Sequence, residues 1–209
     1  MAVLEMKKIF YAYEKDRPVL SNVNTQFDAG KMYAILGPSG SGKTTLLSLI
    51  GGLDTPQKGE VFFEGRNISQ CGLAAHRKDH VSLIFQSYNL IDYMTPIENV
   101  ALTAKKDVLP ILLRLGLTAG EAKRNVMKLS GGQQQRVAIA RALASDTPVI
   151  LADEPTGNLD EDTAGEITDI LKESAHELNK CVIVATHSNK LAAQADVVLN
   201  LKRGSLHTA

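Results

Sequence analysis

The chain has 209 residues, of which 44% are hydrophobic and 22% are charged, which is enough to bury the core of one compact domain. Lys and Arg together number 23, as do Asp and Glu, so the basic excess typical of a non-specific nucleic-acid binder is absent, and we expect no nucleic-acid partner. No apolar run approaches the roughly 18 residues of a membrane span, no secretory pattern is present, and the two cysteines have no metal-like spacing.

The predicted elements alternate between strands and helices along most of the chain. Turn residues bound three predicted strands in the N-terminal part, at residues 3–13, 19–27 and 59–64. Nearly continuous apolar runs predict strands that are buried on both faces, at Met32–Leu36, Val149–Ala152, Val182–Ala185 and Val197–Leu201. Helices are predicted at Lys43–Ile50, Ala164–Leu178 and Asn189–Ala193. This alternation predicts an α/β core with a mostly parallel sheet and an antiparallel β edge.

Residues 87–128 show helix signals in place of strand signals. The stretch from Thr95 to Glu98 has the capping-box pattern with a proline at the first helical position, and the stretch from Thr118 to Glu121 has the capping-box pattern again. We therefore expect one domain, residues 1–209. A small helical subdomain (87–133) is inserted in its α/β core (1–86 and 134–209).

The stretch GPSGSGKT matches the P-loop pattern G-x-x-x-x-G-K-[ST] between a predicted strand and a predicted helix, which predicts a P-loop NTPase fold. Its glycines allow backbone N–H groups to close around phosphate oxygens, Lys43 can reach the outer phosphates, and the Thr44 hydroxyl can bind Mg²⁺. A chance turn is the weaker alternative, because a strand precedes the motif and a helix follows it. The predicted nucleotide-binding residues are Gly37, Pro38, Ser39, Gly40, Ser41, Gly42, Lys43, Thr44 and Thr45.

Polar side chains follow three of the predicted strands. Asp153 and Glu154 end an apolar strand, where one carboxylate can hold Mg²⁺ and its neighbour can orient or deprotonate a water molecule. Gln86 and His187 follow two other strands, at the edge of a parallel sheet where ligands bind. A solvated acidic turn and a surface histidine are the alternatives, which the P-loop makes the weaker interpretation.

A second anion-binding turn is predicted at LSGGQQQR, residues 129–136. Ser130, Gly131, Gly132 and Gln133 form a capping box at the start of a helix, whose free N–H groups point toward an anion. With GPSGSGKTT (37–45), Gln86 in FQSYNL, VILADEPTGNLD (149–160) and THS (186–188), this stretch makes the chain resemble the nucleotide-binding subunit of ATP-binding-cassette (ABC) transporters. The resemblance covers nearly the whole chain.

The resemblance implies an ATP hydrolase that uses ATP and Mg²⁺. It implies that Glu154 is the catalytic base, that His187 is the switch histidine near the γ-phosphate, and that Gln86 contacts Mg²⁺ and the transporter. Tyr13 matches the position of the aromatic platform for adenine better than Tyr11 does, although a structural tyrosine on an edge strand stays open. GTP specificity is not expected, because no guanine motif N-K-x-D is present.

The resemblance also implies two partners. In the family, Ser130–Gln133 of one copy binds the γ-phosphate of ATP held by the P-loop of a second copy, and Asp160 lies at the same interface. A membrane permease is the other partner, which places the chain at the cytoplasmic face of the membrane. Residues 87–100 correspond to part of the groove for the coupling helix of the permease, unless their apolar side chains, those of Tyr88, Leu90, Ile91, Tyr93 and Met94, simply pack the helical subdomain.

Within the family, GGLDTPQKGEV (51–61), FQSYNLI (85–91) and DEPTGNLD (153–160) resemble the subgroup that serves macrolide and antimicrobial-peptide export and lipoprotein release. The stretch between Asn99 and LLRLGL (112–117) is shorter than in that subgroup. The chain ends 22 residues after His187, so no accessory regulatory domain is expected. A soluble ABC ATPase is the competing class, although it usually has coiled-coil insertions or two cassettes. A small-molecule kinase would leave the Gly-Gly turn unexplained.

Overall fold

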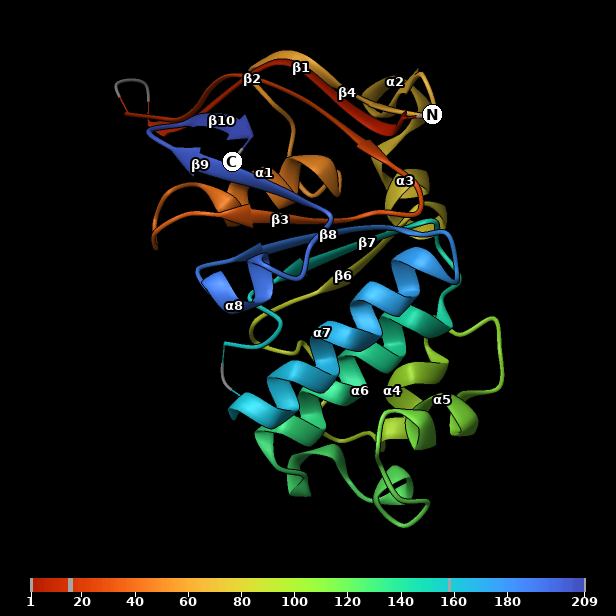
Figure 1. The fold of residues 1–209 in the computed structure, drawn as a ribbon. Helices are drawn as coiled ribbons and strands as arrows, with labels where there is room; N and C mark the ends of the chain where they lie inside the picture. The colour runs from red at the N-terminus through yellow and green to blue at the C-terminus, as the bar shows by residue number, and fades with distance from the viewer. Residues whose placement is uncertain (1, 15–16, 158, 209) are drawn as a thin grey trace.

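The molecule has three layers, with two sheets above a group of helices (Figure 1). The structure, a computed structural model, describes residues 2–14, 17–157 and 159–208. A six-stranded sheet crosses the middle, helix α1 (Lys43–Ile50) and a smaller sheet lie above it, and a group of helices that includes the long α6 (Gly131–Ala144) and α7 (Glu161–His176) lies below. No helix in the described ranges is both long and apolar enough to cross a membrane.

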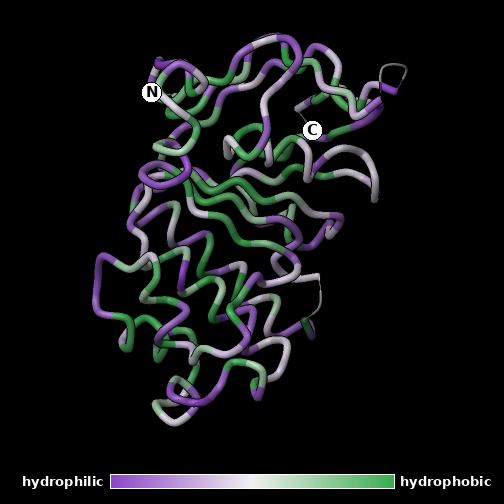
Figure 2. The backbone as a smooth tube through the Cα atoms, turned by 180° about the vertical axis from the view of Figure 1, so that it is seen from behind, coloured by the Kyte–Doolittle hydropathy of each residue, from purple (hydrophilic) through white to green (hydrophobic). Residues whose placement is uncertain are grey.

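The central sheet has the strand order β10-β9-β3-β8-β7-β6. Its strands are β3 (Met32–Leu36), β6 (Val81–Ile84), β7 (Val149–Asp153), β8 (Cys181–Thr186), β9 (Val197–Lys202) and β10 (Ser205–Thr208). All neighbours from β9 to β6 pair in parallel, and β10 closes one edge as an antiparallel hairpin. Figure 2 shows a mostly hydrophobic backbone through the middle of the molecule, as expected for strands covered on both faces.

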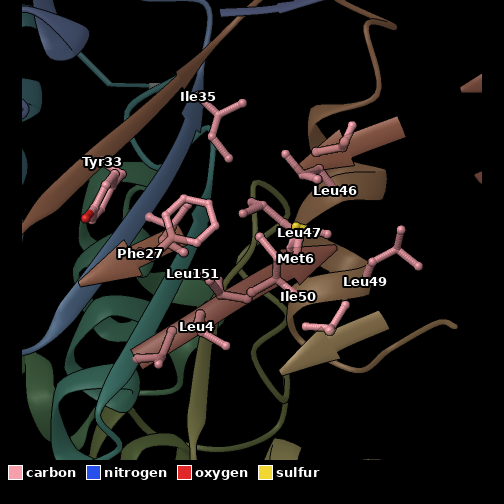
Figure 3. Close-up of a cluster of buried hydrophobic side chains, with 14 of the residues drawn as sticks. Leu4, Met6, Phe27, Tyr33, Ile35, Leu46, Leu47, Leu49, Ile50 and Leu151 are labelled. Carbon is pink, nitrogen blue, oxygen red and sulfur yellow. The ribbon is translucent and has the colours of Figure 1, made fainter. Parts of the chain in front are cut away.

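The upper layer is an antiparallel sheet with the strand order β2-β1-β4-β5. Its strands are β1 (Ala2–Glu14), β2 (Arg17–Asp28), β4 (Lys58–Phe63) and β5 (Arg66–Asn67). Buried Met6 and Phe27 of this sheet share one hydrophobic core with Leu46 of α1 and Leu151 of β7 (Figure 3). Helix α1 is therefore clamped between the two sheets, and the loop that precedes it is held at the end of β3.

The lower layer covers the opposite face of the central sheet. It contains α4 (Pro96–Ala101), α5 (Val108–Arg114), α6 (Gly131–Ala144), α7 (Glu161–His176) and two 3-10 turns, η1 (Glu121–Lys123) and η2 (Val126–Lys128). Alternate residues of the strands reach this layer. Val149 and Leu151 of β7 belong to the upper core, whereas Ile150 and Ala152 belong to the lower core with Val137 of α6.

The predicted α/β class and the strands of the central core are confirmed, with boundaries that differ by a few residues. The helix predicted at 164–178 begins earlier, at Glu161, because the Asp160 side chain accepts a hydrogen bond from Thr163 N and caps it. The capping box at Thr118 forms, but it closes only the short turn η1, because the backbone becomes extended at Arg124. The helix predicted at 189–193 is α8 (Asn189–Ala192). The short helices α2 (Ile68–Cys71) and α3 (Leu73–Asp79) and strand β10 were not predicted.

Candidate functional site

The P-loop connects β3 to α1 and closes tightly on itself. A Cβ at Gly37 would lie 2.7 Å from Ser41 Oγ and 2.8 Å from the Leu201 carbonyl oxygen, and Gly42 has φ +100°. Only glycine fits these two positions without strain. Ser41 Oγ is buried and has no hydrogen-bond partner among the described residues, so the loop presents an unsatisfied polar atom that suits a phosphate oxygen.

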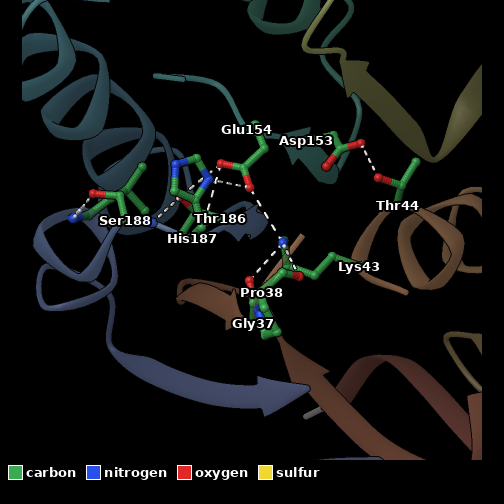
Figure 4. A network of polar contacts seen from close by, with 10 residues as sticks. Gly37, Pro38, Lys43, Thr44, Asp153, Glu154, Thr186, His187 and Ser188 are labelled. Atoms are coloured by element: carbon green, nitrogen blue, oxygen red, sulfur yellow. Dashed lines mark hydrogen bonds and ion pairs between the residues drawn. The ribbon is translucent and has the colours of Figure 1, made fainter. Parts of the chain in front are cut away.

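Lys43 lies folded back inside this loop. Its Nζ donates hydrogen bonds to the carbonyl oxygens of Gly37 at 2.8 Å and Pro38 at 3.2 Å (Figure 4). Only 7% of the side chain is exposed, so its charge is held at the loop and away from bulk water. The lysine is thus placed for anionic oxygens that enter the loop.

Thr44 and Asp153 join the start of α1 to the end of β7. Thr44 Oγ1 donates a hydrogen bond of 2.7 Å to Asp153 Oδ2 (Figure 4). Burial raises the pKa of the Asp153 carboxyl above its ordinary value; the Thr44 bond opposes this shift, and nearby Glu154 adds to it. A hydroxyl and a partly buried carboxylate are the hard oxygen ligands that Mg²⁺ prefers, and a cation there would offset the cost of burying the charge.

Glu154 has a strained backbone and a carboxylate with several neighbours. Its φ is +48°, which is uncommon for a residue other than glycine and is typical of functional sites. Its Oε1 lies 3.5 Å from Lys43 Nζ and 3.0 Å from His187 Nδ1, and its Oε2 accepts a hydrogen bond of 3.2 Å from Thr186 Oγ1. Figure 4 shows these groups converging from the start of α1 and the ends of β7 and β8. The role of Thr186 was missed in the sequence, because a hydroxyl at a strand end is not distinctive.

These residues surround one cavity of about 650 Å³. Its walls include Tyr13, Val19, Ser39, Gly40, Gly42, Lys43, Thr44, Thr45, Gln86, Asp153, Glu154 and His187. The structure thus brings together the P-loop, the carboxylates and both strand-end candidates that were identified separately in the sequence. Val19 is an addition that carries no sequence signal, since it is one valine in an edge strand.

The two candidate tyrosines have different surroundings. Tyr13 is 70% exposed at the cavity, and its hydroxyl lies 3.0 Å from Thr45 Oγ1. Tyr11 is buried, and its hydroxyl donates to the carboxylate of Asp54. The two rings meet edge to face at 5.1 Å, so Tyr11 supports Tyr13 from behind. Tyr13 presents the accessible aromatic surface.

The LSGGQ residues and Asp160 lie outside this cavity. Ser130 Oγ accepts a hydrogen bond from Gln133 N and Gln133 Oε1 accepts one from Ser130 N, which confirms the predicted capping box at the start of α6. Gly131 and Gly132 follow on the first turn of that helix, and exposed Asp160 caps α7. Of these, none lines the P-loop cavity as the structure describes it. The start of α6, where the sequence predicts a second anion-binding turn, is therefore separate from the P-loop cavity.

Comparisons with known proteins agree with these features. The family model described as ABC transporter matches residues 20–157. The ABC transporter ATP-binding protein YclH of Bacillus subtilis is 44% identical and is covered to 96%, with 98% of this chain matched. The macrolide export ATP-binding/permease protein MacB of Pasteurella multocida is 39% identical over 98% of this chain, which spans only 34% of that protein.

Among solved structures, the dimeric ABC transporter cassette MJ0796 has a TM-score of 0.90 at 37% identity, covering 98% of this chain and 96% of that one. MJ0796 comes from Methanocaldococcus jannaschii. A second structure of that cassette, a dimeric post-hydrolysis state bound to ADP and Pi, has a TM-score of 0.89 at 35% identity, covering 99% of this chain and 97% of that one.

Proposed function

The chain belongs to the ABC transporter family, and we propose that it is the subunit that binds and hydrolyses ATP to power transport through a membrane permease. One observation carries this proposal. Lys43 of the P-loop and Glu154, which directly follows β7, face each other across the cavity in which the Thr44–Asp153 pair also lies. Hydrolysis of a nucleoside triphosphate requires a phosphate-binding cation, a metal-binding pair of oxygens and a base in one place.

Each residue has a distinct part in this chemistry. The Lys43 ammonium and the loop N–H groups neutralise the outer phosphates, and Tyr13 stacks on the adenine. When bound, Mg²⁺ supplies charge that stabilises the transferring phosphoryl oxygens; Thr44, Asp153 and Gln86 would hold it. The carboxylate of Glu154 accepts a proton from the attacking water, and His187, which already contacts Glu154 Oε1, steadies the outer phosphate.

A second copy of the chain completes the site in this proposal. The start of α6 lies outside the P-loop cavity. Because α6 has 14 residues, the positive end of its helix dipole lies at this start. Two copies that associate head to tail place Ser130–Gln133 of each against the ATP in the P-loop of the other, with Asp160 at the same interface. The dimeric structures of the MJ0796 cassette support this arrangement.

Light scattering on two variants tests the shared site. Glu154→Gln keeps the shape of the side chain but removes the base, so we expect ATP to accumulate unhydrolysed and the protein to be a monomer without nucleotide and a dimer with ATP. Adding Ser130→Arg places a bulky side chain where the γ-phosphate belongs. We expect this second substitution to abolish the dimer while the monomer still binds ATP. An ATP-dependent dimer that survives Ser130→Arg would contradict the shared site.

The permease is proposed to bind in a groove of about 560 Å³ between α3, β6 and the helices below. Its lining includes the apolar residues Leu83, Phe85 and Leu102. Its charged lining residues are Arg77, Lys78, Lys105 and Arg141 against a single acid, Asp79. Such a groove suits a short amphipathic segment with acidic residues, and its binding would place the chain at the cytoplasmic face of the membrane.

The groove is connected to the segment that follows Gln86, where the sequence predicted a docking surface. Arg141 donates hydrogen bonds to the carbonyl oxygens of Asn89 at 2.6 Å and Tyr88 at 3.0 Å, and it also lines the groove. A bound permease segment can therefore affect the position of Gln86 through Arg141. Exported peptides, macrolide-like drugs or lipoproteins are the proposed cargo, supported by the similarity to MacB. Purification without any permease partner would favour a soluble ABC ATPase.

A further inference from the structure

The capping box formed by Thr118 and Glu121 also contacts the start of α6, through the carboxylate of Glu121. Glu121 Oε2 accepts hydrogen bonds from Thr118 N and Thr118 Oγ1, both at 2.8 Å. Its other oxygen, Oε1, accepts a hydrogen bond of 2.7 Å from Gln133 Nε2. The two carboxylate oxygens thus have different partners: Thr118, which precedes η1, and Gln133 on the first turn of α6.

Gln133 is also hydrogen-bonded to Ser130, so it links Glu121 to Ser130. Gln133 Oε1 accepts a hydrogen bond of 2.9 Å from Ser130 N, and Gln133 N donates one of 3.3 Å to Ser130 Oγ. A carboxylate can only accept, so Glu121 requires the amide of Gln133 to turn its NH₂ group toward Glu121 and its oxygen toward Ser130. The three hydrogen bonds of Glu121, beginning with those from Thr118, lower its pKa and keep it ionised at neutral pH.

This arrangement decides which donors at the start of α6 are available to an anion. The N–H groups of Ser130 and Gln133 are used within the cap. Those of Gly131 and Gly132 have no acceptor among the described residues. An amide side chain in the opposite orientation would face Ser130 N with its own NH₂ group, and two donors repel. The start of the helix would then lose the contact that fixes Ser130.

We propose that Glu121 is a positioning residue for ATP hydrolysis, which acts through Gln133 to hold Ser130, Gly131 and Gly132 in the geometry that receives the γ-phosphate. The proposal rests on the shared site described above. Glu121 itself touches neither nucleotide nor water in this mechanism. Its effect is therefore on association of the two copies, not on binding of ATP to the P-loop.

The chain contains a matched control for this role. Thr95 and Glu98 form the same capping box on the same subdomain: Thr95 N and Thr95 Oγ1 donate to Glu98 Oε2 at 2.7 and 2.8 Å, and Glu98 N donates to Thr95 Oγ1 at 3.3 Å. Within the described ranges, Glu98 bonds only to Thr95. The same substitution at both glutamates therefore separates loss of a cap from loss of the contact to α6.

Two substitutions separate the capping of Thr118 from the contact between Glu121 and Gln133. Glu121→Gln keeps an oxygen that can cap Thr118, since both Glu and Gln occur in capping boxes, but it presents an NH₂ group to Gln133. Thr118→Val weakens the cap and leaves the carboxylate free to accept from Gln133. Each would be introduced into the Glu154→Gln parent, together with Glu98→Gln as the control. The measurements are the ATP-dependent dimer by light scattering, ATP binding by the monomer, and the midpoint of thermal unfolding.

We expect Glu121→Gln to weaken the ATP-dependent dimer by about tenfold or more, because each dimer contains two such contacts and each is charge-assisted. ATP binding by the monomer and the unfolding midpoint should stay unchanged. Glu98→Gln should leave dimerisation at the parent value, and Thr118→Val should lower the unfolding midpoint without weakening the dimer. If Glu121→Gln and Glu98→Gln dimerise equally, the role proposed for Glu121 is wrong, whereas the shared site is not contradicted. A parent that binds ATP but stays monomeric would overturn the shared site, and with it this inference.

Discussion

Lys43 Nζ and Glu154 Oε1 lie 3.5 Å apart, although the two residues are 111 positions apart in the chain. The first belongs to the loop that wraps phosphate, and the second follows a strand on the far side of β8 from β3. Their approach places the proposed phosphate-binding cation and the proposed base at one point of the same cavity. Because Glu154 also has φ +48°, the fold holds this carboxylate in place despite a local cost in backbone energy.

Replacement of this carboxylate should separate hydrolysis from binding. We expect Glu154→Gln to lower the rate of ATP hydrolysis by about 10²–10⁴-fold, because a positioned base contributes on that order, and to leave ATP affinity intact. Single-turnover hydrolysis and nucleotide titration measure the two effects. Glu177→Gln, at an exposed position after α7, is the control and should hydrolyse ATP normally. Wild-type hydrolysis in Glu154→Gln would remove this residue from the mechanism.

Removal of the exposed tyrosine ring should weaken nucleotide binding. Base–aromatic stacking is worth about 1–3 kcal/mol, so Tyr13→Ala should raise the Kd for ATP by roughly 5–150-fold. Tyr13→Phe keeps the ring and loses only the contact of the hydroxyl with Thr45 Oγ1, so it should bind nearly as well as the wild type. Titration with ATP checks both variants. An unchanged affinity in Tyr13→Ala with a loss in Tyr11→Ala would assign the platform to Tyr11 instead.

Asp153 should show opposite effects on stability and on activity. Its pKa is raised in the folded chain, chiefly by burial, so the ionised form is less favourable folded than unfolded. This penalty is absent below about pH 4, where both states are protonated, and it appears as the pH rises through the folded-state pKa. Asp153→Asn should therefore raise the unfolding midpoint slightly at pH 7, by a few degrees at most, and this gain should vanish toward pH 4.

The same substitution should abolish the response to metal. The amide oxygen can still accept the hydrogen bond from Thr44, but it lacks the charge that attracts Mg²⁺. We expect Mg²⁺-dependent hydrolysis to fall by at least about 10²-fold, and Mg²⁺ with ATP to raise the unfolding midpoint much less than in the wild type. Thermal scans from pH 4 to 7, with and without Mg²⁺ and ATP, test both effects. If Asp153→Asn is less stable than the wild type at pH 7 without ligand, this result would contradict the destabilising effect that we assign to burial of the Asp153 carboxylate.

Charge reversal in the basic groove should disrupt binding to the permease without affecting basal hydrolysis. Lys78 and Lys105 line the groove, and both are exposed. Lys78→Glu and Lys105→Glu together should weaken co-purification with the permease by about tenfold or more, because like charges would then meet across the interface. Lys123→Glu, on η1 outside the groove, is the control. Basal hydrolysis by the purified subunit shows whether the variants still fold.

An exposed aromatic residue in the segment that follows Gln86 gives a separate test of permease docking. Tyr93 is 79% exposed, in the segment 87–100 that the sequence assigned to permease binding. A charge at this position should uncouple transport while the isolated subunit keeps its ATPase activity. Transport assays on the reconstituted complex with Tyr93→Glu measure this. Failure of Tyr93→Glu to fold would instead mean that the tyrosine packs the subdomain, which its exposure argues against.

The motifs that the sequence identified correctly are those in which a short stretch sets its own backbone. Gly37 and Gly42 are required wherever a loop must close this tightly, and Ser130 with Gln133 caps a helix through contacts three residues apart. The buried strands of the central sheet were predicted from apolar runs alone, because a strand covered on both faces needs no polar side. For such features, neighbours in the chain supply the physical requirement.

The tertiary structure decided everything that depends on the order of strands and on which faces meet. Thr44 reaches Asp153, 109 positions away, only because β3, β8 and β7 lie side by side in parallel. The difference between Tyr11 and Tyr13 also depends on their tertiary surroundings, because the two residues lie two positions apart on β1, yet Tyr11 is buried beside Asp54 and Tyr13 is exposed at the cavity. The contact of Glu121 with Gln133 depends on how η1 packs beside α6. Sequence patterns within a short stretch do not determine these distances, because each distance depends on many packing contacts between segments that are remote in the chain.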